Sequence, residues 1–227
     1  RRVLFRSTAI PEAKGILPKA LFVGKAPISG KLKQRFVNEI ESITMLALAR
    51  SANTGLADGK LIPEVLIIGL KLTAKATEIP SGVIELIAGQ RKSGIVFACV
   101  REVPFEGRTR EECAFAVRRA QPGRAGHTLI YHVYAGDWQP AGECQLELNG
   151  STIDELWASL CSQAILGTTD FENLDARIVQ HGEIARLEAD VDKLTRDHQR
   201  AKNPAQRNEI YAKLHKAKTQ LAQMREV

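Results

Sequence analysis

Three residues around a long apolar run have side chains of the kind that a metal-dependent nuclease uses. Such an enzyme holds a divalent cation with an acidic residue and a following Glu-x-Lys on adjacent strands, because carboxylate oxygens bind the metal. In this chain Asp58 precedes Glu64, and Lys71 follows Glu64 seven residues later. The spacing is therefore a poor match, and we keep a divergent nuclease as an alternative interpretation only.

The histidines and cysteines do not form a recognisable set of metal ligands. His127 and His132 lie five residues apart in a predicted strand, so their side chains point to opposite faces. The four cysteines are Cys99, Cys113, Cys144 and Cys161. Without a Cys-x-x-Cys pair, they indicate free, buried thiols in a reducing cytoplasm. A Cys–His nucleophile pair stays an open alternative. The glycines follow neither Walker nor dinucleotide spacing, so we predict no catalytic residue, no metal and no cofactor.

Basic residues at three places could contact phosphates. One pair ends a predicted helix, where cations also interact favourably with the helix dipole. A second pair ends a predicted strand, where a solvated loop is the ordinary alternative, and a third flanks the turn between the last two helices. The candidates are Arg91, Lys92, Arg118, Arg119, Arg200 and Lys202. Residues 196–218 carry seven Lys or Arg against two acidic residues, a formal charge of +5, so this segment is the better candidate for contact with nucleic acid or a partner.

The overall charge of the chain gives less support to nucleic-acid binding than its value of +6 suggests. Residues 1–7 read as the translation of a sequencing adapter, and we interpret them as an artefact. Without Arg1, Arg2 and Arg6 the formal charge falls to +3, which is ordinary for a chain of this length. No run approaches the roughly 20 apolar residues of a membrane span, so we predict a cytoplasmic protein.

The order of predicted elements indicates an α+β fold for residues 8–166. Ser29 can cap a helix that precedes a strand at 43–49. The strand at 64–72 is apolar on both faces and is expected to be central in the sheet. A capping box of Ser151 and Asp154 begins the last helix of this domain. The other predicted elements are an irregular arm at 10–27, loops at 51–59 and 104–112, a helix at 80–92, strands at 94–100, 113–119, 127–134 and 143–148, and a linker at 167–170. We expect a mixed sheet with helices packed on one face.

Residues 171–227 are predicted to form an antiparallel, coiled-coil-like helical hairpin. Apolar residues recur at helical spacing in two runs, separated by a turn in which Asn203 suits an N-cap and Pro204 the first helical position. Folding the chain at Asn203 places Val191 opposite Leu214, and Ile178 opposite Val227. The predicted seam comprises Ile184, Leu187, Val191, Leu194, Ile210, Leu214, Ala217 and Leu221.

These landmarks resemble, in their order and spacing, a family of bacterial and archaeal proteins known only as a domain of unknown function. The resemblance runs from residues 17–19 in the arm, through the strands at 43–49, 65–72 and 95–100, to the helix with Trp157 and the Leu-rich hairpin. Genes of that family tend to lie beside DNA methyltransferase and helicase genes in restriction-like or phage-defence loci. The resemblance therefore implies a DNA-related accessory role and supplies no catalytic residue.

We accordingly predict a non-catalytic accessory or adaptor protein of a DNA methyltransferase–helicase system. Its expected partner is the methyltransferase or the helicase of the same locus, with weak, sequence-independent contact to DNA and none to a membrane. The two alternatives are the divergent metal-dependent nuclease and a structural protein–protein interaction module with no nucleic-acid role.

Overall fold

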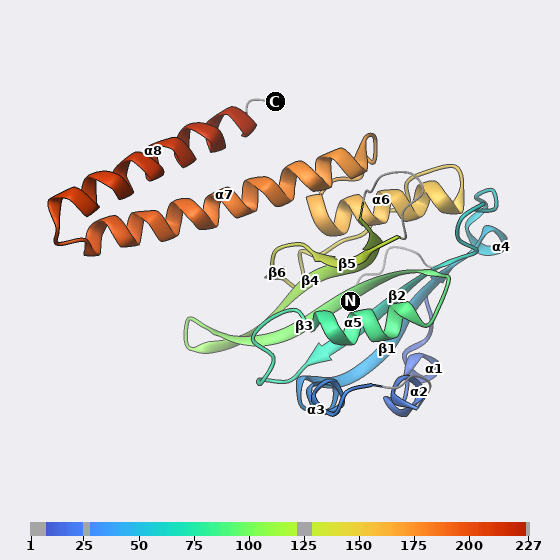
Figure 1. Ribbon diagram of the computed structural model, residues 1–227. Helices are drawn as coiled ribbons and strands as arrows, with labels where there is room; N and C mark the ends of the chain where they lie inside the picture. The colour runs from blue at the N-terminus through green and yellow to red at the C-terminus, as the bar shows by residue number, and fades with distance from the viewer. Residues whose placement is uncertain (1–7, 25–27, 122–128, 226–227) are drawn as a thin grey trace. The chain divides into compact units, whose positions relative to one another are not determined.

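The computed structural model describes residues 8–24, 28–121 and 129–225, which form two compact units (Figure 1). The units meet in the sequence between Glu172 and Asn173. We call the first unit the body and the second the hairpin. The predictions for residues 1–7, for His127 and for Val227 lie outside the described residues.

The body is built on the mixed sheet that the sequence predicts. Its strand order is β1-β2-β3-β4-β5, and the short β6 pairs with β4. Only β2 and β3, joined through helix α5, run parallel, while every other pair in this sheet is antiparallel. The strands are β1 Ile40–Ala49, β2 Val65–Leu72, β3 Gly94–Phe105, β4 Arg108–Ala120, β5 Tyr131–Ala135 and β6 Gln139–Pro140. The predicted α+β class is therefore confirmed.

One face of the sheet is covered by α3 (Gly30–Glu39) and α5 (Ser81–Gly89). Ser29 caps α3 as predicted, because its Oγ accepts a hydrogen bond of 3.2 Å from the Leu32 amide. Ile68 of β2 and Phe97 of β3 belong to the same buried cluster as Ile84 of α5. This cluster is the larger part of the core.

The opposite face is covered by α6 (Ile153–Leu166), so the expectation of helices on one face only is wrong. Val65 and Ile67 alternate with the residues of the first face and are buried as well. Gly94, opposite Val65 in the register, lies so close to α6 that a Cβ there would sit 2.6 Å from the Trp157 ring. The physical reason is that a central strand apolar on both faces must be shielded from water on both.

The amino-terminal arm closes the free edge of β1. It contains two single-turn helices, α1 (Glu12–Gly15) and α2 (Ala20–Val23), where the sequence predicts an irregular segment. The Ile10 amide donates to the Leu46 carbonyl, and the Leu17 amide to the Ile43 carbonyl, each at 2.9 Å. These hydrogen bonds leave less of the edge available for pairing with another chain.

Three segments of the body differ from the prediction. Residues 104–112, expected as a charged loop, instead continue β3 and β4 through a tight turn at Glu106 and Gly107, both with positive φ. Glu112 of this segment pairs with Arg101 across the strands and with Arg110 on β4, and the cross-strand pair is a long-range effect that local polarity does not reveal. Residues 143–148 are all described and none of them is in a strand. Residues 51–59 include a single-turn helix, α4 (Ser51–Thr54).

The start of α6 lies one residue away from the predicted capping box. Thr152 is the N-cap, and its Oγ1 accepts from the Glu155 amide at 3.1 Å. Glu155 in turn accepts from the Ser151 amide at 2.7 Å. Asp154 is freed to bind the loop before β2, where it accepts from the amides of Lys60, Leu61 and Ile62 at 2.6–3.1 Å.

The predicted linker at 167–170 is attached to α6. Ser159 Oγ donates to the Thr169 carbonyl at 2.9 Å, and Ser162 Oγ donates to the Asp170 carbonyl at 2.5 Å. Both serines are fully buried. The segment therefore folds as part of the body, because buried hydroxyls need acceptors.

The hairpin consists of α7 (Leu174–Arg200) and α8 (Pro204–Arg225), packed against each other as predicted. Asn203 Oδ1 accepts hydrogen bonds from the Ala205 amide at 2.9 Å and the Gln206 amide at 3.4 Å, which fixes the turn. At the other end Gln180 Nε2 donates to the Met224 carbonyl at 3.0 Å. Within the seam, Leu187 and Leu214 are buried, and the other predicted members are half-buried.

Candidate functional site

The two arginines predicted at the end of β4 do not form one patch. Arg118 and Arg119 are adjacent in a strand, so their side chains leave opposite faces of the sheet. Arg118 forms an ion pair with Glu85 of α5 at 2.6 Å, and its guanidinium lies 3.9 Å from the centre of the Tyr131 ring. Arg119, which is opposite His132 in the register, also interacts within the chain. The charge of Arg118 is thus used to attach α5 to the sheet.

Arg91 and Lys92 are exposed just beyond α5, which ends at Gly89 and not at Lys92 as predicted. Arg91 also lies at a cavity of about 420 Å³ on the body. The residues lining this cavity are Leu17, Leu21, Phe22, Met45, Leu66, Ile68, Gln90 and Arg91. The lining is mainly apolar, so Arg91 contributes its only charged group.

The residues considered for a nuclease are engaged by other protein groups. Glu64 accepts from Arg50 Nε at 2.6 Å and from Ser93 Oγ at 2.9 Å, and Asp58 accepts from Ser51 Oγ. Burial raises the pKa of Glu64, but the hydrogen bonds from Arg50 and Ser93 outweigh it and hold the pKa below its ordinary value. Over the described parts of the chain, no group of three or more His, Cys, Asp or Glu side chains is placed to hold a metal ion.

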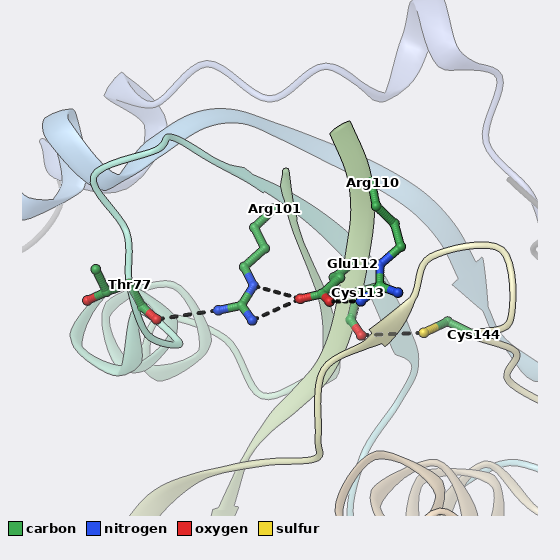
Figure 2. Close-up of polar contacts among 6 residues, drawn as sticks. All are labelled: Thr77, Arg101, Arg110, Glu112, Cys113 and Cys144. Carbon is green, nitrogen blue, oxygen red and sulfur yellow. Dashed lines mark hydrogen bonds and ion pairs between the residues drawn. The ribbon is translucent and has the colours of Figure 1, made fainter. Parts of the chain in front are cut away.

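A group of ion pairs surrounds Glu112 on β4 (Figure 2). Arg101 of β3, which faces Glu112 across the strands, donates from Nε at 3.1 Å and from Nη2 at 2.9 Å. Arg110 donates to the other carboxylate oxygen at 2.5 Å. Figure 2 shows the carboxylate lying between the two guanidinium groups. We call Arg101, Arg110 and Glu112 the Glu112 cluster.

Aromatic rings complete the surroundings of the Glu112 cluster. The Arg101 guanidinium lies 4.0 Å from the Trp138 ring centre, and the Arg110 guanidinium lies 3.9 Å from that of Phe105. Hydrogen bonds from the two arginines hold the pKa of Glu112 below its ordinary value. Glu112 is therefore ionised at neutral pH and is unsuited to act there as a general acid. This geometry serves to hold the long β3–β4 ribbon together.

A pair of cysteines lies directly behind this cluster, and the sequence does not predict it. Cys113 follows Glu112 on β4, and the Cys144 thiol donates to the Cys113 carbonyl at 3.4 Å (Figure 2). Cys113 is buried and Cys144 is half-buried. Interaction between the two cysteine side chains raises the pKa of Cys113 and lowers that of Cys144. By contrast, burial raises the pKa of Cys99 to about 12.

The hairpin presents the basic surface that the sequence predicts at residues 196–218. All seven Lys and Arg of this segment are exposed. Lys213 forms an ion pair with Glu209 at 2.7 Å, within one turn of α8. Among the described residues, Arg200 and Lys202 have no ion-pair partner. Near the turn, the rings of His198 and Tyr211 lie 5.9 Å apart, which links the two helices.

Comparisons with known proteins give one match, to a protein family. The family is described as "Domain of unknown function (DUF4391)", and it matches residues 6–221, which is nearly the whole chain. No curated protein and no solved structure matches. In the described parts of the chain, none of the helices combines the length and the apolar character needed to cross a membrane.

Proposed function

The chain belongs to the DUF4391 family, and on this premise we propose that it is a non-catalytic accessory protein of a DNA methyltransferase–helicase system. In this proposal the body is a folded platform, and the hairpin contacts DNA or the protein partner. The cytoplasm is the compartment in which such a system works. The gene neighbourhood implied by the family resemblance suggests the partner, while the hairpin suggests the mode of contact.

The observation that carries the proposal is the exposed charge at residues 196–218. A surface with seven exposed cations and a formal charge of +5 attracts polyanions. Helix α8 shares this character, with five Lys or Arg against Glu209 alone among acidic residues. Of the six candidates, Arg200 and Lys202 are the two that lie within this segment, and no ion pair within the described chain offsets their charge.

Contacts of this kind predict the form that binding takes. Lysine and arginine side chains on a helical surface reach phosphates without reading bases, so affinity should be independent of sequence. Each phosphate contact that is lost should also lower the slope of log K against log salt by about 0.9. A protein partner would use the same exposed surface, and its acidic residues would show the same dependence on salt.

The test is fluorescence anisotropy with a labelled DNA duplex of arbitrary sequence, titrated at roughly 50 to 200 mM salt. Arg200→Glu with Lys202→Glu should abolish binding or lower its salt slope. The matched control is Lys31→Glu with Lys33→Glu, which makes the same charge change on exposed residues of α3. If both variants lose the same DNA affinity, the loss is explained by the change in net charge, and the proposed role of the hairpin is wrong.

Two further measurements separate this proposal from its alternatives. The full chain should co-purify with the methyltransferase or the helicase when all three are expressed together. Co-purification without any DNA binding would favour the structural interaction module. Cleavage of DNA that requires Mg²⁺ and is lost in Glu64→Gln or Asp58→Asn would establish the nuclease instead. The pairing of Glu64 with Arg50 makes that cleavage the unexpected result.

A further inference from the structure

Two cysteines that lie 31 residues apart in the chain come together beside β4. β6 pairs with β4 so that Gln139 is opposite Cys113. The turn that follows β6 brings Cys144 back to the same point, where its Sγ is 3.4 Å from the Cys113 carbonyl oxygen. This hydrogen bond and the pairing of β6 with β4 place the two cysteines side by side, which is the first requirement for a disulfide between them. Figure 2 shows both residues at this position.

The two thiols differ in their access to solvent. Cys144 is half-buried in the connection between β6 and α6, whereas Cys113 is 5% exposed. A reagent in solution therefore meets Cys144 first. Interaction with the Cys113 side chain lowers the pKa of Cys144, which favours the nucleophilic thiolate form. The pair thus has an accessible thiol and a protected one within reach, the arrangement of an attacking and a resolving cysteine.

We propose that Cys144 and Cys113 are a redox-active dithiol that a hydroperoxide converts into an intramolecular disulfide. This inference is independent of the proposed role in DNA-linked defence. In a reducing cytoplasm both residues are thiols at rest, so the disulfide would form only during oxidation.

The reaction has two balanced steps. The Cys144 thiolate attacks one peroxide oxygen, so that an S–O bond forms, the O–O bond breaks, and the other oxygen leaves as an alcohol or water after protonation. Sulfur loses two electrons and becomes a sulfenic acid, and the peroxide is reduced. The Cys113 sulfur then attacks Cys144, the S–S bond forms, and the hydroxide leaves as water with the Cys113 proton.

The bond would change the body at a defined place. Cys144 lies in the segment between β6 and α6, and this segment is bonded to α6, where the Gln163 amide donates to the Glu147 carbonyl at 3.0 Å. A disulfide would add a covalent link between this segment and β4, directly beside Glu112. The oxidised protein should therefore resist unfolding at higher urea concentration than the reduced one.

The experiment is oxidation of the full chain with hydrogen peroxide, followed by blocking of free thiols and peptide mass analysis without reduction. The expected result is the loss of two hydrogen atoms per molecule and a cross-linked peptide containing Cys113 and Cys144. Cys144→Ser should abolish the cross-link. Cys113→Ser should instead leave a Cys144 sulfenic acid that dimedone traps, which keeps the test independent of any change in fold. Cys161→Ser, a buried cysteine of α6, is the matched control and should form the same cross-link.

Three outcomes would overturn the proposal. One is that oxidised Cys144 appears while Cys113 remains a free thiol in the unmodified sequence. Another is a cross-link that joins two molecules or involves Cys99 or Cys161. The third is that a thiol reagent modifies Cys144 no faster than Cys161 in the folded protein, because Cys144 would then lack the accessibility that the mechanism needs.

Discussion

The body and the hairpin bury their apolar residues in different ways. In the body, helices cover both faces of the sheet, and side chains such as Phe97, Ile84 and Leu156 have at most 1% of their surface exposed. In the hairpin the best-buried seam residues are Leu187 and Leu214, at 5% and 7%. The rest of the seam is half-buried, and Tyr211 is 57% exposed.

This difference shows that the two units are stabilised to different degrees by their own packing. The body has a core on both sides of its sheet, and burial of these side chains is its main source of stability. The hairpin has one narrow line of contact and leaves most of both helices in water. Helices that bury so little apolar surface gain little stability from packing, and their exposed residues are available for contact with another molecule.

The largest loss of stability is expected from a substitution in the core of the body, which tests whether the body is more deeply packed than the hairpin. Phe97→Ala should lower the free energy of unfolding by about 3–5 kcal/mol, because it removes a fully buried ring of β3 from the cluster that also contains Ile84 of α5. Urea unfolding followed by tryptophan fluorescence measures this directly, since Trp138 and Trp157 both belong to the body. Leu61→Ala, at a residue 85% exposed, is the control and should shift the value by less than about 0.5 kcal/mol.

The corresponding change in the hairpin should have a smaller effect. Leu214→Ala is expected to cost about 2–3 kcal/mol, the low end for a buried leucine, because the seam is only one layer deep. Far-UV circular dichroism should report the loss, and tryptophan fluorescence should not change. Combining it with Val191→Ala should give a non-additive result, since the two residues share one layer of the predicted seam. A matching shift in tryptophan fluorescence would show that the two units unfold together.

A third prediction concerns where the body ends. The free energy of unfolding should be about 1–2 kcal/mol larger for a chain that stops at Glu172 than for one that stops at Leu166. Urea unfolding of the two chains measures this difference. The shorter chain lacks the carbonyls of Thr169 and Asp170 that accept from the buried hydroxyls of Ser159 and Ser162. Ser159→Ala with Ser162→Ala should remove most of this difference. Equal stability of the two unaltered chains would place the boundary at Leu166.

The smallest change in the stability of the body is expected when the pH is lowered. Burial raises the pKa of Asp154, but amide hydrogen bonds from Ile62, Lys60 and Leu61 outweigh it, and the pKa of Glu64 is lowered as well. A carboxylate whose pKa is lower in the folded protein than in the unfolded chain stabilises the fold. This stabilisation is complete above the unfolded-state pKa of about 4 and is lost as the pH falls through the folded-state pKa. Tryptophan fluorescence should therefore show the body weakening below about pH 4, and Asp154→Asn should reduce that dependence on pH. A body whose urea midpoint is constant through this range would contradict the argument.

The sequence predicts best those features that depend on local periodicity. The prediction of the hairpin is correct, including the position of its turn, because apolar spacing and the capping preference of Asn203 act within a few residues. The central strands are also correct, since unbroken apolar runs such as 65–72 have few other structures open to them. The cap of α6 is wrong by one residue, because Ser151, Thr152, Asp154 and Glu155 all suit the first turn of a helix, and tertiary contacts decide between them.

Features that depend on distant residues are the ones that the sequence does not reveal. The charges at 104–112 indicate a loop until Glu112 is seen opposite Arg101 across the strands. The pairing of Cys113 with Cys144 depends on the two-residue strand β6, which has no periodicity to detect. Arg118 and Arg119 do not form one surface for a simpler reason. Both lie in β4, and the side chains of neighbouring residues in a strand point to opposite faces of the sheet.

The cover of the second sheet face also has a consequence for synthesis of the chain. Every strand from β1 to β4 precedes α6, which is the helix that packs on this side of the sheet against β3, β4 and β5. A ribosome adding roughly 5–20 residues per second needs about 2–9 seconds to pass from the end of β4 at Ala120 to the end of α6 at Leu166. During that interval the nascent sheet has an uncovered apolar side. Exposed apolar surface favours aggregation and chaperone binding, so we expect the yield of the protein in the cell to depend on how quickly this region is translated.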